Sequence, residues 1–287
     1  MLCPFYRANL TKLFAIYFCA NICGSVEVMI GPSGKRAILL HFELNESTYV
    51  STKAHHGTDS QLWSFDDGNT WENLSALVYQ PQPNLGGEIG PSAGIQSASG
   101  RIYFTSNSDA LGQFAFMYWS EDFGQTYKAS ASLPKQYSDV GECGITFLVS
   151  ARDGRILMNC RTGRGHRAVS VWSADGVLIN ISFPASLHDP GCQGSVVNEA
   201  GVIYQSNANT SRPSCKGKDT DCGRNRMAIK KSVDQGKNWL PLVDVWPGPS
   251  AYSQLVALGD KRLGLLFEAG ASNPYDQIVW TTVSTDK

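Results

Sequence analysis

The sequence predicts an all-β protein, and specifically a β-propeller, from a short pattern that recurs at nearly even spacing. The pattern S-x-D-x-G-x-[TN]-[WY] begins at Ser64, Ser120 and Ser232, and a shortened copy begins at Ser173. These serines lie 56, 53 and 59 residues apart along the chain. Repeats of about 50 residues are typical of stacked supersecondary units, so we expect one propeller rather than two unrelated domains.

Each copy of the pattern has the composition of a tight turn. Serine and aspartate side chains accept hydrogen bonds from nearby backbone N–H groups, and glycine adopts positive φ without penalty. The terminal Trp or Tyr supplies an apolar face that packs beneath the turn. We interpret the pattern as an element of the fold rather than a metal loop, because a calcium-binding EF-hand has a denser run of oxygen ligands and a distal Glu.

Short apolar runs flank these turns and are the predicted strands. They occupy residues 36–40, 101–104, 114–119, 155–158, 168–172, 201–204 and 262–267. Several strands in each period fit the four-stranded blade of a propeller. No amphipathic helix is expected beyond the N-terminus.

The N-terminal 24 residues differ from the rest of the chain. Arg7 and Lys12 precede an apolar run at residues 13–20, which predicts a secretory signal peptide, with 25–287 forming the propeller. The run is too short to span a bilayer, so no transmembrane segment is expected. An aberrant leader on a truncated gene product is the alternative. The net charge of −1 argues against nucleic acid as a partner.

Sequons and cysteines bear on the compartment. Five N-x-[ST] sequons occur, at Asn9, Asn45, Asn73, Asn180 and Asn209. The last four would carry glycans only in a secretory compartment.

Cys215 and Cys222 bracket a polar loop and are either a disulfide pair or two unrelated thiols. Cys143, Cys160 and Cys192 lie in strand-like surroundings and are expected to be small core residues. No zinc-ligand spacing is present, so no metal is expected.

Further blocks place the chain in a family. They are G-P-S-A-G-I-Q at 90–96, E-C at 142–143, N-C-R at 159–161, G-C-Q-G-S-V at 191–196, R-N-R-M-A-I at 224–229, W-P-G-P-S-A-Y-S at 246–253 and F-E-A-G at 267–270. With the repeats, which are Asp boxes, they resemble the exo-α-sialidases (neuraminidases), most closely the lysosomal-type animal enzymes. The resemblance covers about residues 26 to 285 and implies a propeller that is six-bladed in the family, with about five blades' worth of sequence here.

The resemblance implies a retaining exo-α-sialidase that releases terminal sialic acid from glycoproteins, oligosaccharides and gangliosides. The implied location is the secretory pathway, lysosomal or extracellular, or the cytoplasm if the leader is not a signal peptide. Sialylated glycoconjugates are the implied partners, together with the lysosomal multi-enzyme partners of the family. No cofactor or metal is needed for this chemistry.

The resemblance also assigns residues. Tyr252 matches the nucleophile and Glu142 the carboxylate that takes its proton, since sialidases use Tyr where other glycosidases use a second carboxylate. A neutral phenol approaches an anionic substrate without the repulsion that a carboxylate would meet. Arg161 and Arg224 match two of the three arginines that hold the sialic acid carboxylate, because guanidinium groups bind carboxylates through paired, charge-assisted hydrogen bonds.

Glu268 matches the acid that orients the first arginine of this family. The remaining arginines near these motifs lack a motif position and are expected at the surface: Arg164, Arg167 and Arg226.

The chain departs from the family at its beginning. The family's first blade carries a [FY]-R-I-P motif followed by the Asp that serves as general acid/base, and neither is found; residues 26–71 align with the second blade. Asp59, expected in a loop, is a conceivable substitute acid. The alternative to an enzyme is therefore a sialidase-like protein that binds sialoglycans without turnover, or a truncated gene product.

Overall fold

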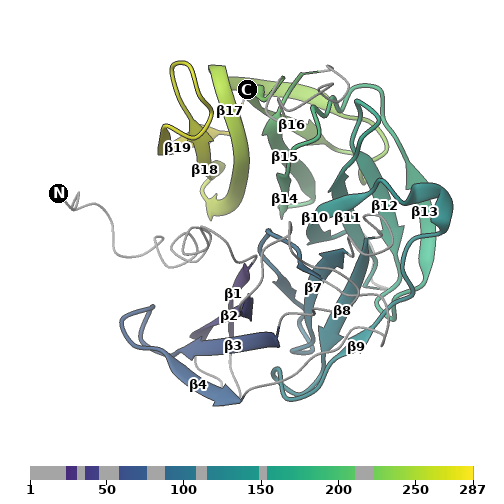
Figure 1. Cartoon of the computed structure of the whole chain (residues 1–287), viewed down its shortest axis with the longest axis vertical. Coiled ribbons are helices and arrows are strands. Elements are labelled where there is room, and N and C mark those ends of the chain that lie inside the picture. Colours follow the sequence, from purple (N-terminus) through teal and green to yellow (C-terminus); the bar gives the residue numbers. More distant parts are fainter. Residues whose placement is uncertain are drawn as a thin grey trace.

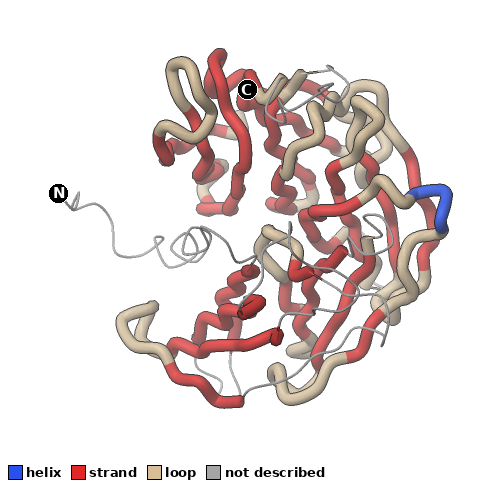
Figure 2. Tube along the Cα trace, in the orientation of Figure 1, coloured by secondary structure: helices blue, strands red, loops and turns tan. Residues whose placement is uncertain are grey.

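The computed structural model describes residues 24–30, 36–44, 58–75, 88–107, 115–148, 154–210 and 223–286. Regular structure in these ranges is β-strand throughout, apart from one 3-10 turn at Lys135–Tyr137 (Figure 2). The prediction of an all-β protein is confirmed. The predicted leader and the loop between Cys215 and Cys222 lie outside the described residues, so the interpretations of both segments stay predictions.

Four antiparallel sheets follow one another in chain order. The first contains β1 (Gly24–Ile30), β2 (Arg36–Leu44), β3 (Thr58–Ser64) and β4 (Glu72–Ser75). The second contains β5 (Glu88–Ile89), β6 (Ile95–Gln96), β7 (Ile102–Asn107), β8 (Phe116–Ser120) and β9 (Lys128–Ala129). The third contains β10 (Gly141–Phe147), β11 (Ile156–Arg161), β12 (Ala168–Trp172) and β13 (Leu178–Ser182).

The fourth sheet has six strands, β14 (Gly194–Glu199), β15 (Val202–Ala208), β16 (Asn225–Ser232), β17 (Leu240–Gly259), β18 (Arg262–Ala269) and β19 (Gln277–Ser284). The 20-residue β17 pairs with β16 through its first part and with β18 through its second part. One long strand therefore serves two successive blades. The sheets succeed one another around a common centre, toward which β1, β10 and β14 lie (Figure 1).

The core consists of four hydrophobic clusters, each between two successive blades. Leu39 and Trp63 of the first sheet pack with Phe104 of the second, and the second and third sheets meet around Trp119 and Trp172. A third cluster joins the third sheet to the start of the fourth, and the last joins β15 and β16 to the second part of β17 and to β18. Each blade buries its faces against its neighbours, so a single blade has no core of its own. The core forms only when successive blades pack together.

The Asp boxes are turns between the last two strands of a blade. In the copy between β16 and β17, Ser232 Oγ donates to Asp234 (2.8 Å) and accepts from Gly236 N (2.9 Å), and Asp234 also accepts from Asn238 N (2.8 Å). Gln235 and Gly236 have φ of 64° and 83°, which explains the glycine. The other two complete copies make the same bonds. Their interpretation as fold elements fits this geometry.

These turns also join one blade to the blade before it. Gln61 of the first sheet donates to Gly124 O (2.8 Å) and accepts from Tyr127 OH (3.0 Å), both in the Asp box of the second sheet. Trp239, from the box of the fourth sheet, is 3% exposed in the cluster shared with the third sheet. Trp71 of the first box is 36% exposed by contrast. Burial of the terminal aromatic therefore depends on the neighbouring blade.

Several expectations are settled by position. Asp59 lies within β3 rather than in a loop, so that expectation was wrong. Asn180 is exposed on β13, whereas Asn209 is 9% exposed and its side-chain oxygen accepts a hydrogen bond from Lys230 Nζ (2.6 Å), so of these two sequons only Asn180 presents its amide to solvent. None of the described helical residues forms a helix long and apolar enough to cross a membrane.

Gly176, in the shortened copy of the repeat, tests this packing. Its φ is 79°, and a Cβ built there would lie 2.8 Å from Ser130 Cβ and 3.1 Å from Ser130 Cα in the preceding sheet. We expect Gly176→Ala to lower the free energy of unfolding by ~1–2 kcal/mol for the left-handed backbone, and by a further ~1–3 kcal/mol for overpacking. Urea unfolding measures both.

Gly201→Ala is the matched control, because Gly201 has φ 88° with nothing within 4 Å of an added Cβ. It should show only the backbone cost. Equal losses in the two variants would mean that the shortened copy does not pack tightly against the second sheet.

Candidate active site

A tyrosine and a glutamate from two different sheets meet in a short hydrogen bond. Tyr252 OH donates to Glu142 Oε1 at 2.6 Å. Glu142, the second residue of β10, has φ 45°, and the β10–β11 register shifts between Gly141 and Cys143. Tyr252 lies where the β17–β18 register is also irregular. Bulges of this kind turn a side chain out of the regular alternation of a strand, so the two groups face each other.

Two arginines flank this pair. Arg161, the last residue of β11, donates through Nη1 to Glu142 Oε2 (2.7 Å). Arg224, immediately before β16, places its Cζ 5.8 Å from the centre of the Tyr252 ring. Arg224 is held by Gly191 O, which accepts from Nη2 (3.1 Å), and by its Nη1 contact with Tyr275 OH (2.5 Å).

Glu268, near the end of β18, is brought to the same place. Its Oε2 accepts a hydrogen bond from the backbone N–H of Tyr252 (2.9 Å). The structure thus gathers all five residues that the motifs single out, Tyr252, Glu142, Arg161, Arg224 and Glu268.

The charges at the centre follow from burial and neighbours. Burial opposes the charge of Glu142, but the guanidinium of Arg161 and the hydrogen bonds from Arg161 and Tyr252 outweigh it and hold the pKa of Glu142 below its ordinary value. Burial, and then the nearby carboxylate of Glu142, raise the pKa of Tyr252 well above its ordinary value. Burial likewise opposes the charge of Arg161, yet Glu142 keeps its pKa raised. At neutral pH the site therefore holds a phenol beside an ionised carboxylate.

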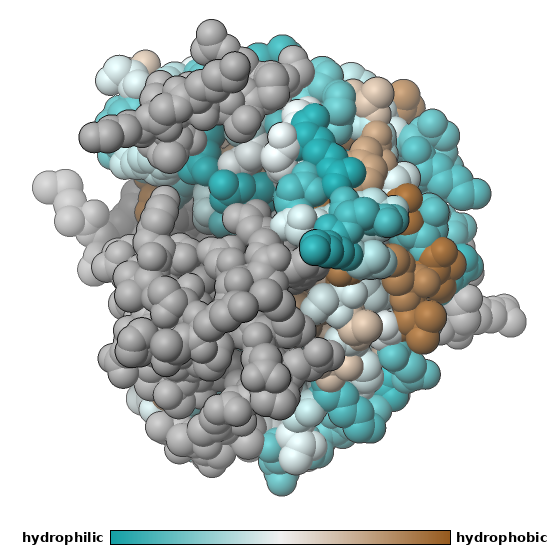
Figure 3. Space-filling model, turned by 45° about the vertical axis from the view of Figure 1, so that its right-hand side comes forward, coloured by the Kyte–Doolittle hydropathy of each residue, from teal (hydrophilic) through white to brown (hydrophobic). Residues whose placement is uncertain are grey.

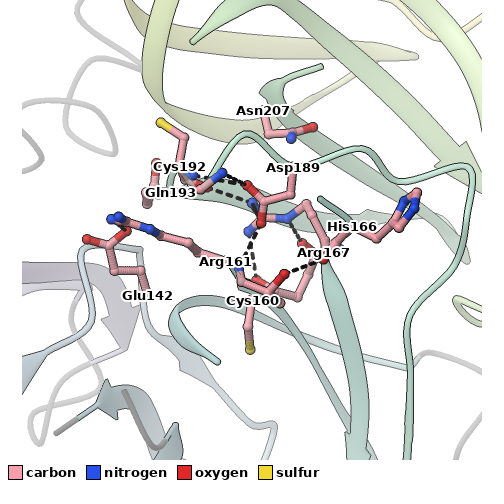
Figure 4. A network of polar contacts seen from close by, with 12 residues as sticks. Glu142, Cys160, Arg161, His166, Arg167, Asp189, Cys192, Gln193 and Asn207 are labelled. Carbon is pink, nitrogen blue, oxygen red and sulfur yellow. Dashed lines mark hydrogen bonds and ion pairs between the residues drawn. The ribbon is translucent and has the colours of Figure 1, made fainter. Parts of the chain in front are cut away.

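A buried ion pair of Arg167 with Asp189 lies near these residues. The burial of Arg167 contradicts the sequence prediction. Arg167, expected at the surface, is 0% exposed. Its guanidinium donates to Cys192 O (2.9 Å) and to the side chain of Asn159, and it lies 3.6 Å from Asp189 (Figure 4). The prediction failed because Asp189 is 22 positions away along the chain, and nothing local marks the two charges as partners. Arg164 and Arg226, paired with Asp139 and Asp244, are partly exposed as expected.

Two of the cysteines form a bond that the sequence analysis did not predict. Cys143 and Cys160 are buried, as expected of core residues, but they form a disulfide bond between paired positions of β10 and β11. This bond joins the residue after Glu142 to the residue before Arg161. Cys192 is a buried thiol, and its burial raises its pKa to about 12. The motifs E-C and N-C-R mark both cysteines, but their pairing follows from the register of β10 with β11.

Tyr275 is a site residue that the sequence did not reveal, since it lies in a polar turn between β18 and β19 with no motif around it. Among the described residues, no group of three or more His, Cys, Asp or Glu side chains is placed to hold a metal ion.

The fold and this site define a β-propeller with a polar centre where the third and fourth sheets meet. A family model described as a BNR repeat-like domain matches residues 29–266. The chain is 27% identical to a sialidase of Micromonospora viridifaciens, over 74% of this chain and 34% of that protein, and 24% identical to an exo-alpha-sialidase of Aspergillus fumigatus, over 82% and 56%. The chain therefore belongs to the sialidase family with its BNR repeat-like domain.

Solved structures agree on the fold. An intramolecular trans-sialidase from Ruminococcus gnavus in complex with oseltamivir carboxylate superposes with a TM-score of 0.61 at 20% identity, over 80% of this chain and 51% of that one. Trypanosoma rangeli sialidase in complex with sialic acid gives 0.59 at 18% identity, over 92% and 44%. The predicted β-propeller is thereby confirmed. The chain spans between about a third and somewhat over half of the two curated relatives' own lengths.

The disulfide should contribute substantially to stability. The two cysteines are 17 positions apart, and closing a loop of this length is worth about 3 kcal/mol in the chain-entropy model. We expect the double variant Cys143→Ala/Cys160→Ala to lose about that much free energy of unfolding, measured in urea. Cys192→Ala, which removes a buried thiol without a bridge, should lose clearly less. Equal losses would mean that the bridge adds nothing beyond packing.

The lowered pKa of Glu142 predicts a pH-dependent stability. In the folded protein the pKa of this carboxyl lies below its ordinary value of 4.5. The stabilisation is therefore present above pH 4.5 and is lost as the pH falls through the lowered pKa of the folded state. The difference in free energy of unfolding between the native protein and Glu142→Gln should therefore shrink below pH 4.5. A difference that is constant down to the acid limit of folding would show that Glu142 is not stabilised in its ionised form.

Proposed function

We propose that this protein is a retaining exo-α-sialidase that hydrolyses terminal sialic acid from glycoconjugates. The observation that carries the proposal is the 2.6 Å hydrogen bond from Tyr252 OH to the ionised Glu142, with two guanidinium groups beside it. A phenol hydrogen-bonded to an ionised carboxylate has a general base in place to take its proton, and clustered arginines suit an anionic substrate.

In the proposed first step, Tyr252 gives its proton to Glu142, and the phenolate oxygen bonds to the anomeric carbon of sialic acid. The glycosidic C–O bond breaks, and the aglycone oxygen leaves with the bonding electron pair and takes up a proton from solvent or an acid. In the second step water attacks the same carbon, its proton passes to the medium, and Tyr252 leaves with the proton returned from Glu142. Two inversions give net retention.

The electrostatics support the use of a tyrosine. A neutral phenol and the carboxylate of the substrate do not repel each other, and the phenolate charge develops only during the reaction, beside Arg161 and Arg224. We assign these two arginines to the substrate carboxylate, and Glu268 to positioning through its bond to the backbone of Tyr252.

The finer features of the proposal rest on the motif resemblance. They are a lysosomal-type enzyme acting on glycoproteins, oligosaccharides and gangliosides, a secretory, lysosomal or extracellular location, and lysosomal multi-enzyme partners. The exposed sequon at Asn180 supports passage through the secretory pathway, where a glycan would be attached.

Hydrolysis of a fluorogenic sialoside by the purified full chain, from acid to neutral pH, tests the proposal. We expect turnover in the native protein, none in Tyr252→Phe, and a rate about 10²–10⁴-fold lower in Glu142→Gln, because each of these variants lacks either the nucleophile or its base.

Two results would contradict the enzyme. Turnover that survives Tyr252→Phe would assign the reaction to other groups. A folded, monodisperse native protein that binds sialic acid without turnover would be a sialoglycan-binding protein instead.

The arginines are expected to act on binding. Replacing Arg224 by Met removes a charge-assisted contact worth ~1.5–3 kcal/mol, so KM for the sialoside should rise about 10–150-fold with a smaller change in kcat. Arg226→Met, at the partly exposed guanidinium two positions away that pairs with Asp244, is the matched control and should leave KM unchanged. Similar KM changes in both variants would remove Arg224 from the substrate clamp.

A further inference from the structure

The loop Asp189–Gln193 bonds to three of the segments that supply the candidate site, those of Arg161, Arg224 and Tyr252. Asp189 is 1% exposed, and both of its carboxylate oxygens are used. One accepts from Thr162 N (2.9 Å), directly after Arg161. The other accepts from Gly191 N (2.9 Å) and Cys192 N (3.0 Å) within the loop. A single carboxylate thus fixes the shape of the loop and ties it to the end of β11.

The far side of the loop reaches the other two segments. Gly191 O accepts from Arg224 Nη2 (3.1 Å), and Gln193 Oε1 accepts from Ser253 N (3.0 Å), the residue after Tyr252. The amide of Gln193 is itself oriented, because it donates to Ser92 Oγ (3.0 Å). Residues that are far apart in the sequence are therefore held from one short loop.

Arg167 completes this arrangement. It contributes the positive charge 3.6 Å from Asp189, and it holds Cys192 O (2.9 Å) from below (Figure 4). A buried pair of opposite charges seldom adds net stability over apolar residues of the same size, because both ions lose their hydration. The pair instead fixes directions, since its two side chains take part in six hydrogen bonds, three at Asp189 and three at Arg167.

We propose that the buried Arg167–Asp189 pair is a positioning unit, which through the loop Asp189–Gln193 sets where Arg161, Arg224 and Tyr252 lie relative to one another. The consequence for catalysis rests on the proposed function, but the positioning itself does not. Removal of the pair should loosen three segments together, including Ser253, which neither Arg167 nor Asp189 touches.

The test uses the full chain with both charges removed, Arg167→Met/Asp189→Asn, so that no unpaired buried ion is left to unfold it. The matched control is Arg164→Met/Asp139→Asn, which removes a partly exposed Arg–Asp pair with a 2.6 Å contact. Hydrogen exchange of the backbone amides is measured in all three proteins, and urea unfolding confirms that each is folded.

We expect the N–H groups of Thr162, Gly191, Cys192 and Ser253 to lose protection in the first variant and to keep it in the control. Loss that is confined to the amides bonded to Asp189, with Ser253 unchanged, would overturn the proposal. If the double variant does not fold, Arg167→Lys is measured under the same criterion, because it keeps both buried charges and removes the guanidinium that bonds to Cys192 O and Asn159.

A second readout addresses the site. Affinities for sialic acid and for its methyl ester are compared by calorimetry, because only the acid presents a carboxylate to the arginines. In the first variant the preference for the acid should fall by about tenfold or more, while a role in stability alone would leave this ratio unchanged and overturn the proposal. Absence of binding in the native protein would count against the proposed function, and hydrogen exchange would still decide the positioning.

Discussion

The carboxylate of Glu142 is the point on which the candidate site depends. One oxygen accepts from Tyr252 OH and the other from Arg161 Nη1, so a single side chain joins the third sheet to the fourth. Burial would favour the protonated acid, and only the positive charge and hydrogen bonds around it keep it ionised. The positive charge of Arg161 thus keeps Glu142 ionised, and the ionised Glu142 in turn fixes the direction of the Tyr252 hydroxyl through their hydrogen bond.

The propeller makes this meeting possible at low cost. Glu142 and Tyr252 are separated by 110 positions in the sequence, yet successive blades bring β10 and β17 to a common centre, and irregular register at both strands turns the side chains inward. The Asp boxes act locally, because each one closes the turn between two strands of a blade, and the boxes of the second and fourth sheets contact the preceding blade. Packing between neighbouring blades therefore supplies the stability of the propeller, and its centre holds polar groups.

The sequence was sufficient for whatever is local or repeated. Three complete copies of one turn predicted the blade, and each of the seven short apolar runs overlaps a strand of the structure, namely β2, β7, β8, β11, β12, β15 and β18. The motif blocks also singled out five side chains that the structure places together. What the sequence did not reveal was the pairing of side chains that lie apart along the chain. The sequence around Arg167 is that of a polar turn and is typical of a surface arginine. Its burial depends on Asp189, which lies in the connection between β13 and β14. The Cys143–Cys160 bond likewise depends on the β10–β11 register, which no local pattern specifies.

In the proposed reaction, binding and base strength are coupled through Arg161. In the free site its guanidinium bonds to Glu142, and this contact holds the pKa of the carboxyl down. A substrate carboxylate at Arg161 would share that positive charge and add a negative one nearby, and both effects raise the pKa of Glu142. A carboxylate with a higher pKa accepts the phenol proton more readily, so the driving force for forming the Tyr252 phenolate would grow only when the anionic sugar is in place. A neutral glycoside would leave Glu142 as it is, which makes the carboxylate of the substrate part of the activation as well as of the recognition.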